Sequence, residues 1–155
     1  MKKYLLLVMV TLAGLTGCKK SDTSSNFDAT AQAAADDAKI KAYIQTNNIN
    51  ATRDDSGVYY QVISPGSGAY PTASSSVSVN YTGKLLDGTV FDSNSLNNYA
   101  LSGLIKGWQY GIPHINVGGR ILLIIPSGLG YGNTAQGKIP ANSVLVFTID
   151  LLGFK

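Results

Sequence analysis

Hydrophobic and polar residues follow two different periods along this chain. Residues 28–46 are rich in alanine, and Ile40, Tyr43 and Ile44 recur at the spacing of one helical face. This pattern predicts one amphipathic helix that ends near Asn47. Its narrow apolar stripe fits either the rest of the chain or a second copy, and a semi-disordered polar stalk is the remaining alternative.

Beyond Gly57 the pattern is typical of β-strands separated by turns. Four segments are rich in β-branched, aromatic or leucine residues: 58–63, 77–86, 121–125 and 144–152. In the second of these, apolar and polar residues alternate, and it ends at Asp87-Gly88, which is a strong hairpin signal. The strands therefore predict a mostly antiparallel sheet.

Only one short helix is predicted within this strand-rich region. It covers about Leu104 to Gly111 and is broken by Pro113. Residues 128–142 are rich in glycine and proline and predict a long surface loop, which in a small domain is often functional. Strands with one helix on a face give an α+β fold, here preceded by the amino-terminal helix.

The first residues predict export. A basic start precedes an apolar stretch from Tyr4 to Leu15, which is shorter than the about 20 residues of a membrane span. The stretch closes on Leu15-Thr16-Gly17-Cys18, which resembles the lipobox of bacterial lipoproteins, where cleavage precedes an acylated cysteine. A plain secretory signal is the alternative.

These signals divide the chain into four parts. We expect a lipoprotein signal peptide at 1–17, a lipidated tether at 18–27 that begins with Cys18, a helix and linker at 28–56, and the strand-rich domain at 57–155. Lipid attachment would place the protein in the cell envelope, at the outer membrane or the periplasmic face of a Gram-negative bacterium, without a transmembrane helix.

Charge and composition exclude several functions. Loss of Lys2 and Lys3 with the signal lowers the formal charge from +3 to +1, and the other basic residues are scattered, so no nucleic-acid partner is expected. The chain has one histidine, one cysteine and no glutamate, which leaves no ligand set for a metal and predicts no cofactor. His114 is the only histidine that could serve a catalytic triad, and the sequence has no Gly-x-Ser-x-Gly nucleophile elbow between a strand and a helix. A catalytic triad is therefore not expected.

The chain contains many aromatic residues, with nine tyrosines, four phenylalanines and one tryptophan. On the second arm of the predicted hairpin, Phe91 directly precedes Asp92. Either Phe91 is an ordinary core residue, or both side chains share a pocket with Tyr81. Because Asp92 lies in an apolar segment, we expect it to be buried, and a buried carboxylate needs a partner.

Short motifs along the strand-rich region occur in the order found in one known family. They are Val79-Asn80-Tyr81-Thr82-Gly83, Gly88-Thr89-Val90-Phe91-Asp92-Ser93, Ile105-Lys106-Gly107-Trp108, Val117-Gly118-Gly119-Arg120, Ile125-Pro126-Ser127, Gly130-Tyr131-Gly132, Ile139-Pro140-Ala141-Asn142 and Leu145-Val146-Phe147. From about Gly57 to Lys155 the chain resembles an FKBP-type peptidyl-prolyl cis-trans isomerase, and its amino terminus is similar to the lipoprotein form of that family.

The resemblance implies a strongly curved antiparallel half-barrel wrapped around the short helix, with a prolyl pocket between them. The catalytic pocket it implies is formed by Tyr81, Phe91, Asp92, Trp108, Tyr131 and Phe147, and the substrate-binding residues are Leu104, Ile105, Ile139 and Tyr99. In it, the Trp108 indole forms the floor, Ile105 N–H and the Tyr131 hydroxyl bind substrate carbonyls, and Ile139 forms part of the rim.

The implied activity is isomerisation of X–Pro bonds during the folding of exported proteins, with proline-containing polypeptides and rapamycin-type macrolides as ligands. The alternatives are a non-catalytic binding or chaperone lipoprotein and a structural lipoprotein whose aromatics are all core. The chain departs from the family at Ser93–Asn98, expected as a loop, which lacks a basic partner for Asp92. Tyr81, amides or water would then hold the carboxylate, and Tyr99 would replace a missing aromatic.

Overall fold

The computed structural model of this chain describes residues 27–155, so Cys18 and the expected signal and tether up to Asn26 lie outside the described residues. The elements are α1 (Ala29–Thr46), β1 (Thr52–Arg53), β2 (Tyr59–Ser64), β3 (Ser76–Leu85), β4 (Val90–Ala100), η1 (Leu101–Gly103), α2 (Lys106–Gly111), η2 (Ile112–His114), β5 (Arg120–Ile125), η3 (Ser127–Leu129) and β6 (Leu145–Phe154), where η denotes a 3-10 helix. No helix within residues 27–155 combines the length and apolar character needed to cross a bilayer.

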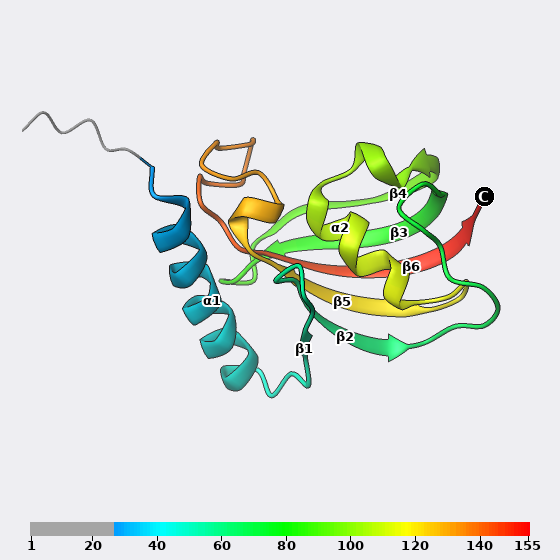
Figure 1. The fold of residues 1–155 in the computed structure, drawn as a ribbon, viewed down its shortest axis with the longest axis horizontal. Coiled ribbons are helices and arrows are strands. Elements are labelled where there is room, and N and C mark those ends of the chain that lie inside the picture. The colour runs from blue at the N-terminus through cyan, green and yellow to red at the C-terminus, as the bar shows by residue number, and fades with distance from the viewer. Residues whose placement is uncertain (1–26) are drawn as a thin grey trace, which may run out of the picture.

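One antiparallel sheet organises the molecule. Its six strands lie in the order β1-β2-β5-β6-β3-β4, so that β6, the last strand in sequence, pairs with both β5 and β3. Figure 1 shows α2 lying along one face of the sheet and α1 beside one end of the strands. The predicted α+β architecture, with an open antiparallel sheet, one short helix on a face and an amino-terminal helix, is confirmed.

The continuous apolar run in β5 is explained by burial on both faces of the sheet. Ile121, Leu123 and Ile125 point into the main core under α2. Ile124 points the other way, into a second cluster with Ile40 of α1. A strand that is covered on both sides carries no polar alternation, which is why the sequence showed only a hydrophobic run.

α1 has the length and stripe that the sequence predicted. Asp28 caps it by accepting hydrogen bonds from the backbone N–H of Thr30 at 2.9 Å and of Ala31 at 3.1 Å. Ile40 is fully buried, and Tyr43 and Ile44 pack half-buried around the same cluster. Of the alternatives left open, the structure therefore shows an ordered helix whose stripe docks on its own domain.

Two glycines of α2 face the sheet and allow the helix to pack closely on it. A Cβ atom at Gly111 would come within 2.5 Å of the Leu123 side chain, and one at Gly107 would overlap the side chain of Ile125. The helix begins at Lys106, two residues later than predicted, and Pro113 does not end it abruptly, because the chain continues as η2 with proline in its first turn.

Gly107→Ala is expected to destabilise the fold by about 1–2 kcal/mol. The added methyl group overpacks against Ile125 at a cost of about 1–3 kcal/mol, while alanine in a helix recovers about 0.5–1 kcal/mol. Gly103→Ala is the matched control, because its Cβ would meet only Tyr99 at an ordinary 3.7 Å. Urea denaturation measures both, and equal unfolding free energies would contradict the close-approach interpretation.

One polar segment differs from expectation. Ser93–Asn98, expected as a loop, belongs to β4, and there Tyr81 pairs with Asn94 and Asn80 with Ser95. β4 is an edge strand whose side chains are mostly exposed, so an apolar–polar alternation was not required for it to form. The segment after Asp92 therefore extends the sheet instead of leaving it.

Candidate functional site

A pocket of about 200 Å³ lies between α2 and the sheet, at the end where the loop from β5 to β6 returns. Its walls come from β3, β4, β6, α2 and that loop. Its lining residues are Tyr81, Phe91, Asp92, Leu96, Tyr99, Leu104, Ile105, Trp108, Tyr131 and Phe147. The structure thus brings together all six predicted catalytic residues and three of the four predicted substrate-binding residues.

Four aromatic rings pack edge to face around this pocket. Trp108 meets Tyr81 at 5.0 Å and Phe147 at 5.2 Å between ring centroids, with interplanar angles of 79° and 90°. Phe91 meets Phe147 at 5.5 Å and 84°. Such geometry places the positive edge of one ring against the negative face of the next, which stabilises this arrangement of the set.

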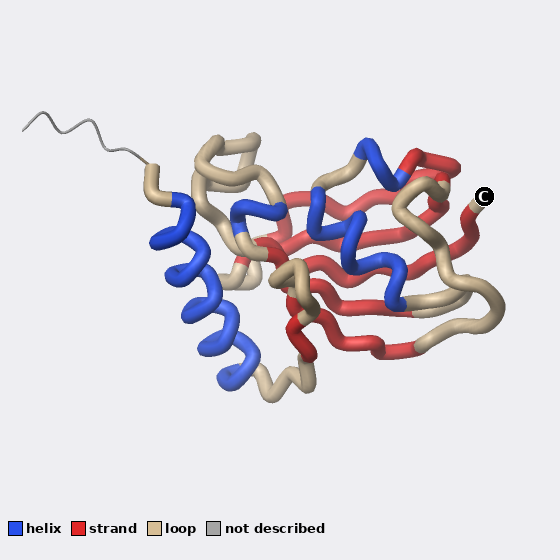
Figure 2. Tube along the Cα trace, viewed as in Figure 1, coloured by secondary structure: helices blue, strands red, loops and turns tan. Residues whose placement is uncertain are grey.

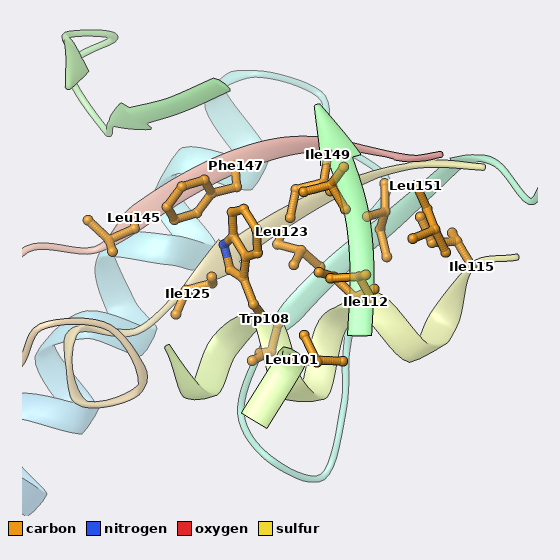
Figure 3. Close-up of a cluster of buried hydrophobic side chains, with 14 of the residues drawn as sticks. Leu101, Trp108, Ile112, Ile115, Leu123, Ile125, Leu145, Phe147, Ile149 and Leu151 are labelled. Atoms are coloured by element: carbon orange, nitrogen blue, oxygen red, sulfur yellow. The ribbon is translucent and has the colours of Figure 1, made fainter. Parts of the chain in front are cut away.

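Trp108 is the deepest member of the set. It is 3% exposed, and Figure 3 shows its indole beside Phe147 among the aliphatic side chains of the core. Within residues 27–155 its indole N–H has no hydrogen-bond acceptor. The pocket is therefore backed here by a largely apolar ring that is embedded in the core.

Gly83 makes the aromatic arrangement sterically possible. A Cβ atom there would lie 2.5 Å from the Phe91 ring and 2.7 Å from the Phe147 ring. Gly83 belongs to β3 and pairs with Asp92 on one side and Phe147 on the other. The glycine was part of a recognised motif, but its role as the space for two rings follows only from the structure.

Asp92 is held by Tyr81. The Tyr81 hydroxyl donates a hydrogen bond of 2.5 Å to Asp92 Oδ2. The expectation that Asp92 is buried was wrong, because the strand turns its side chain to the exposed mouth of the pocket. The missing basic partner is therefore replaced by a phenol and by access to water. Burial of the phenol, its hydrogen bond to Asp92 and the negative charge there raise the pKa of Tyr81 to about 12.

Two tyrosines are expected to ionise near pH 12 instead of the usual value near 10. Burial and a hydrogen bond to a carboxylate raise the pKa of Tyr81, and likewise of Tyr59 beside Asp37, to about 12. Because the folded pKa exceeds the unfolded one, both bonds stabilise the fold fully below pH 10 and are lost as pH rises through 12. Ultraviolet titration of phenolate formation measures this.

Single substitutions assign the late titration step. Tyr81→Phe and Tyr59→Phe should each remove one residue's absorbance change from the step near pH 12. Loss from the earlier step instead, in either variant, would contradict the hydrogen-bonded arrangement.

Tyr131 enters the pocket from the loop between β5 and β6, which is the tan segment beside η3 in Figure 2. Its side chain is 40% exposed. The loop is nevertheless well connected, because the carbonyl of Ser127 accepts hydrogen bonds from the N–H of Gly130 at 3.0 Å and of Gly132 at 2.8 Å. These two residues flank Tyr131, so their hydrogen bonds hold the backbone of Tyr131 in place.

Two residues correct the sequence-based picture of the site. Ile139 was predicted at the rim, but it is 5% exposed, packs in the main core and does not line the pocket. Leu96 does line the pocket and was missed. It is the one large apolar residue in a polar stretch of β4, and this isolation was the only available signal.

Larger hollows elsewhere lack this convergence of aromatic rings. A groove of about 480 Å³ on the other face of the sheet is lined largely by polar side chains, among them the ion pair of Arg120 and Asp150. A cleft of about 470 Å³ separates part of α1 from the loop after β5. His114 lies outside the pocket lining, stacked on Tyr60 with ring centroids 3.9 Å apart.

Comparisons with known proteins bear on the family of this chain. A family model described as FKBP-type peptidyl-prolyl cis-trans isomerase matches residues 68–152. The FKBP-type peptidyl-prolyl cis-trans isomerase FkpA of Escherichia coli (strain K12) is 39% identical over 129 residues, which cover 79% of this chain and 48% of that protein. The chain thus spans about half the length of the curated relatives it matches.

Two solved structures share the fold. The crystal structure of FkpA from Escherichia coli has a TM-score of 0.69 at 39% identity and covers 81% of this chain and 62% of that one. The crystal structure of a peptidyl-prolyl cis-trans isomerase from Pseudomonas syringae pv. tomato has a TM-score of 0.70 at 27% identity and covers 83% of this chain and 96% of that one.

Proposed function

Because this chain belongs to the FKBP-type peptidyl-prolyl cis-trans isomerase family, we propose that it accelerates the cis–trans isomerisation of X–Pro bonds in polypeptides. The observation that carries this proposal is the aromatic pocket itself. Its floor and walls are formed mostly by packed aromatic and aliphatic side chains, and a single hydroxyl–carboxylate pair, Tyr81 with Asp92, stands at its mouth.

The chemistry follows from the nature of the X–Pro amide. The planar forms interconvert over tens to hundreds of seconds, because amide resonance creates a barrier of about 18–20 kcal/mol. Twisting the C–N bond removes that resonance and reduces the charge separation of the amide. A pocket that excludes water therefore favours the twisted amide over the planar one, and no nucleophile or titrating base takes part.

The pocket residues take separate parts in this step. Trp108 supplies the flat floor under the pyrrolidine ring, and Phe91 and Phe147 supply the walls that exclude water. Ile105 offers its N–H to one substrate carbonyl, and the Tyr131 hydroxyl binds another. The orientation of Ile105 is supported by its own carbonyl, which accepts the first hydrogen bonds of α2 from Trp108 and Gln109.

An isomerase assay on the chain from residue 19 onward tests the proposal. We expect it to accelerate isomerisation of an X–Pro peptide and the proline-limited refolding of a model protein. A protein that binds such a peptide without accelerating either reaction would be a non-catalytic binding or chaperone module.

Macrolide binding tests the pocket independently of turnover. A rapamycin-type macrolide that fills the pocket is expected to quench Trp108 fluorescence, because the indole is the floor and the only tryptophan. A flat titration would argue that the aromatic residues are purely core.

We also propose that the protein is a lipid-anchored member of the cell envelope that assists the folding of exported proteins. The support is the resemblance of Leu15–Cys18 to a lipobox. Metabolic labelling with a radioactive fatty acid should mark the natural chain and leave Cys18→Ser unlabelled. Equal labelling of both, or of neither, would contradict acylation at Cys18.

A further inference from the structure

Asp36 is a fully buried carboxylate in the middle of α1. A carboxylate in such a place is costly unless hydrogen bonds replace its water. Asp36 Oδ2 accepts hydrogen bonds from the N–H of Ser127 at 2.8 Å and from its hydroxyl at 2.6 Å. Asp36 Oδ1 accepts a third from the Gln32 amide at 2.8 Å. The carboxylate thus connects α1 to the loop after β5.

Ser127 contacts both Asp36 and the loop segment that carries Tyr131. It is the first residue of η3, and its backbone carbonyl accepts the hydrogen bonds from Gly130 and Gly132 that flank Tyr131. One residue therefore receives the polar contact from α1 and fixes both sides of the tyrosine. Figure 1 shows η3 in this position, between α1 and the end of α2.

Direct packing between α1 and this loop is incomplete. The cleft of about 470 Å³ lies between them, lined on one side by Ala29 and Ala33 and on the other by Leu129 and Gly132. Small side chains on α1 leave this space unfilled. The hydrogen bonds of Asp36 therefore carry much of the attachment between the helix and the loop.

We propose that Asp36 is a positioning residue for isomerisation, which sets the place of the Tyr131 hydroxyl through Ser127. α1 then influences the geometry of the prolyl site, although it contributes no residue to the pocket lining. This inference rests on the proposed isomerase function and adds the coupling between helix and pocket to it.

Asp36→Asn in the full-length chain tests the coupling. The substituted amide keeps the size of the side chain but carries no charge, so the hydrogen bonds from the Ser127 N–H and hydroxyl lose their charge assistance and weaken. We expect kcat/KM for an X–Pro peptide to fall about tenfold, which corresponds to an interaction of about 1.4 kcal/mol.

A double-mutant cycle with Tyr131→Phe separates positioning from general structural damage. If Asp36 acts through the Tyr131 hydroxyl, Asp36→Asn has little further effect once that hydroxyl is absent. If it acts through stability alone, the two effects multiply, and the proposal is overturned. Should Asp36→Asn fail to fold, Ser127→Ala takes its place in the same cycle, because it removes only the hydroxyl contact.

Asp37→Asn is the matched control on the same helix. Asp37 accepts hydrogen bonds or ion contacts from Tyr59, Lys41 and Arg53 and has none to Ser127. We expect its kcat/KM to stay within about twofold of the natural chain. An equal loss in Asp36→Asn and Asp37→Asn would count against a specific path to the pocket.

A readout without turnover separates this proposal from the isomerase proposal. Asp36→Asn should shift the NMR signals of the Tyr131 ring, assigned with Tyr131→Phe, while Asp37→Asn leaves them in place. If the natural chain accelerates no isomerisation, the proposed function fails and the shift alone decides the coupling. If the natural chain is active, the cycle decides it, and multiplying effects reject the positioning role whether or not the signals shift.

Discussion

Phe91→Ala is expected to lower kcat/KM for an X–Pro peptide by about 10- to 100-fold, equivalent to about 1.4–2.7 kcal/mol of transition-state stabilisation. The ring forms one wall of the pocket and meets Phe147 edge-on at 5.5 Å. Its removal admits water to the place where the amide twists, which weakens the preference for the less charge-separated form. Because Phe91 is only half-buried, the loss of stability should stay below the about 3–5 kcal/mol of a core Phe→Ala change.

Phe154→Ala is the matched control for this loss. Phe154 is also a half-buried phenylalanine against the main core, but it does not line the pocket. The control should lose stability and keep its turnover at a temperature where both variants are folded.

Asp92→Ala should resemble Phe91→Ala, because it leaves the Tyr81 hydroxyl without its acceptor. Turnover that merely follows the folded fraction in every variant would remove these residues from the site.

Gly83→Ala is expected to damage both stability and turnover. Its methyl group would lie within 2.5–2.7 Å of two pocket rings, Phe91 and Phe147, so both rings or the β3 backbone must move. Overpacking of this kind costs about 1–3 kcal/mol of unfolding free energy. Since the displaced rings are the walls of the pocket, kcat/KM should fall about tenfold or more. Urea denaturation and the peptide assay measure the two effects.

Gly153→Ala controls for the general effect of alanine in a strand. Gly153 lies in β6, and a Cβ atom there would meet no atom within 4 Å. Its stability and turnover should stay near those of the natural chain. If the two glycine variants behave alike, the space at Gly83 is not what shapes the aromatic walls.

Features with a local cause could be predicted from the sequence. The hairpin was visible because Val77 and Val79 alternate with polar residues on one arm, and Asp87-Gly88 supplies the turn. Gly88 adopts a φ of +88°, and Asp87 Oδ1 accepts a hydrogen bond from the N–H of Thr89. Each of these interactions spans only a few residues, so a short window of sequence contains all of them.

Features that depend on distant contacts could not be predicted. Asp36 reads as one more polar residue of α1, and its partner Ser127 is 91 residues away. Ile139 sits in a loop of polar and small residues, yet it reaches the main core. Conversely, Asp92 follows an apolar residue, but the edge strand exposes it. Burial at these positions is decided by the path of the chain in space, which the local pattern does not encode.

The position of β6 has a consequence for how the molecule forms. β6 lies between β5 and β3, so without it the strands fall into two separate groups, β1-β2-β5 and β3-β4. It also supplies Phe147 to the pocket. Contacts between strands far apart in sequence form late and slowly. During synthesis from the amino terminus, the aromatic pocket therefore cannot be complete until the carboxyl-terminal strand has emerged and joined the two groups into one sheet.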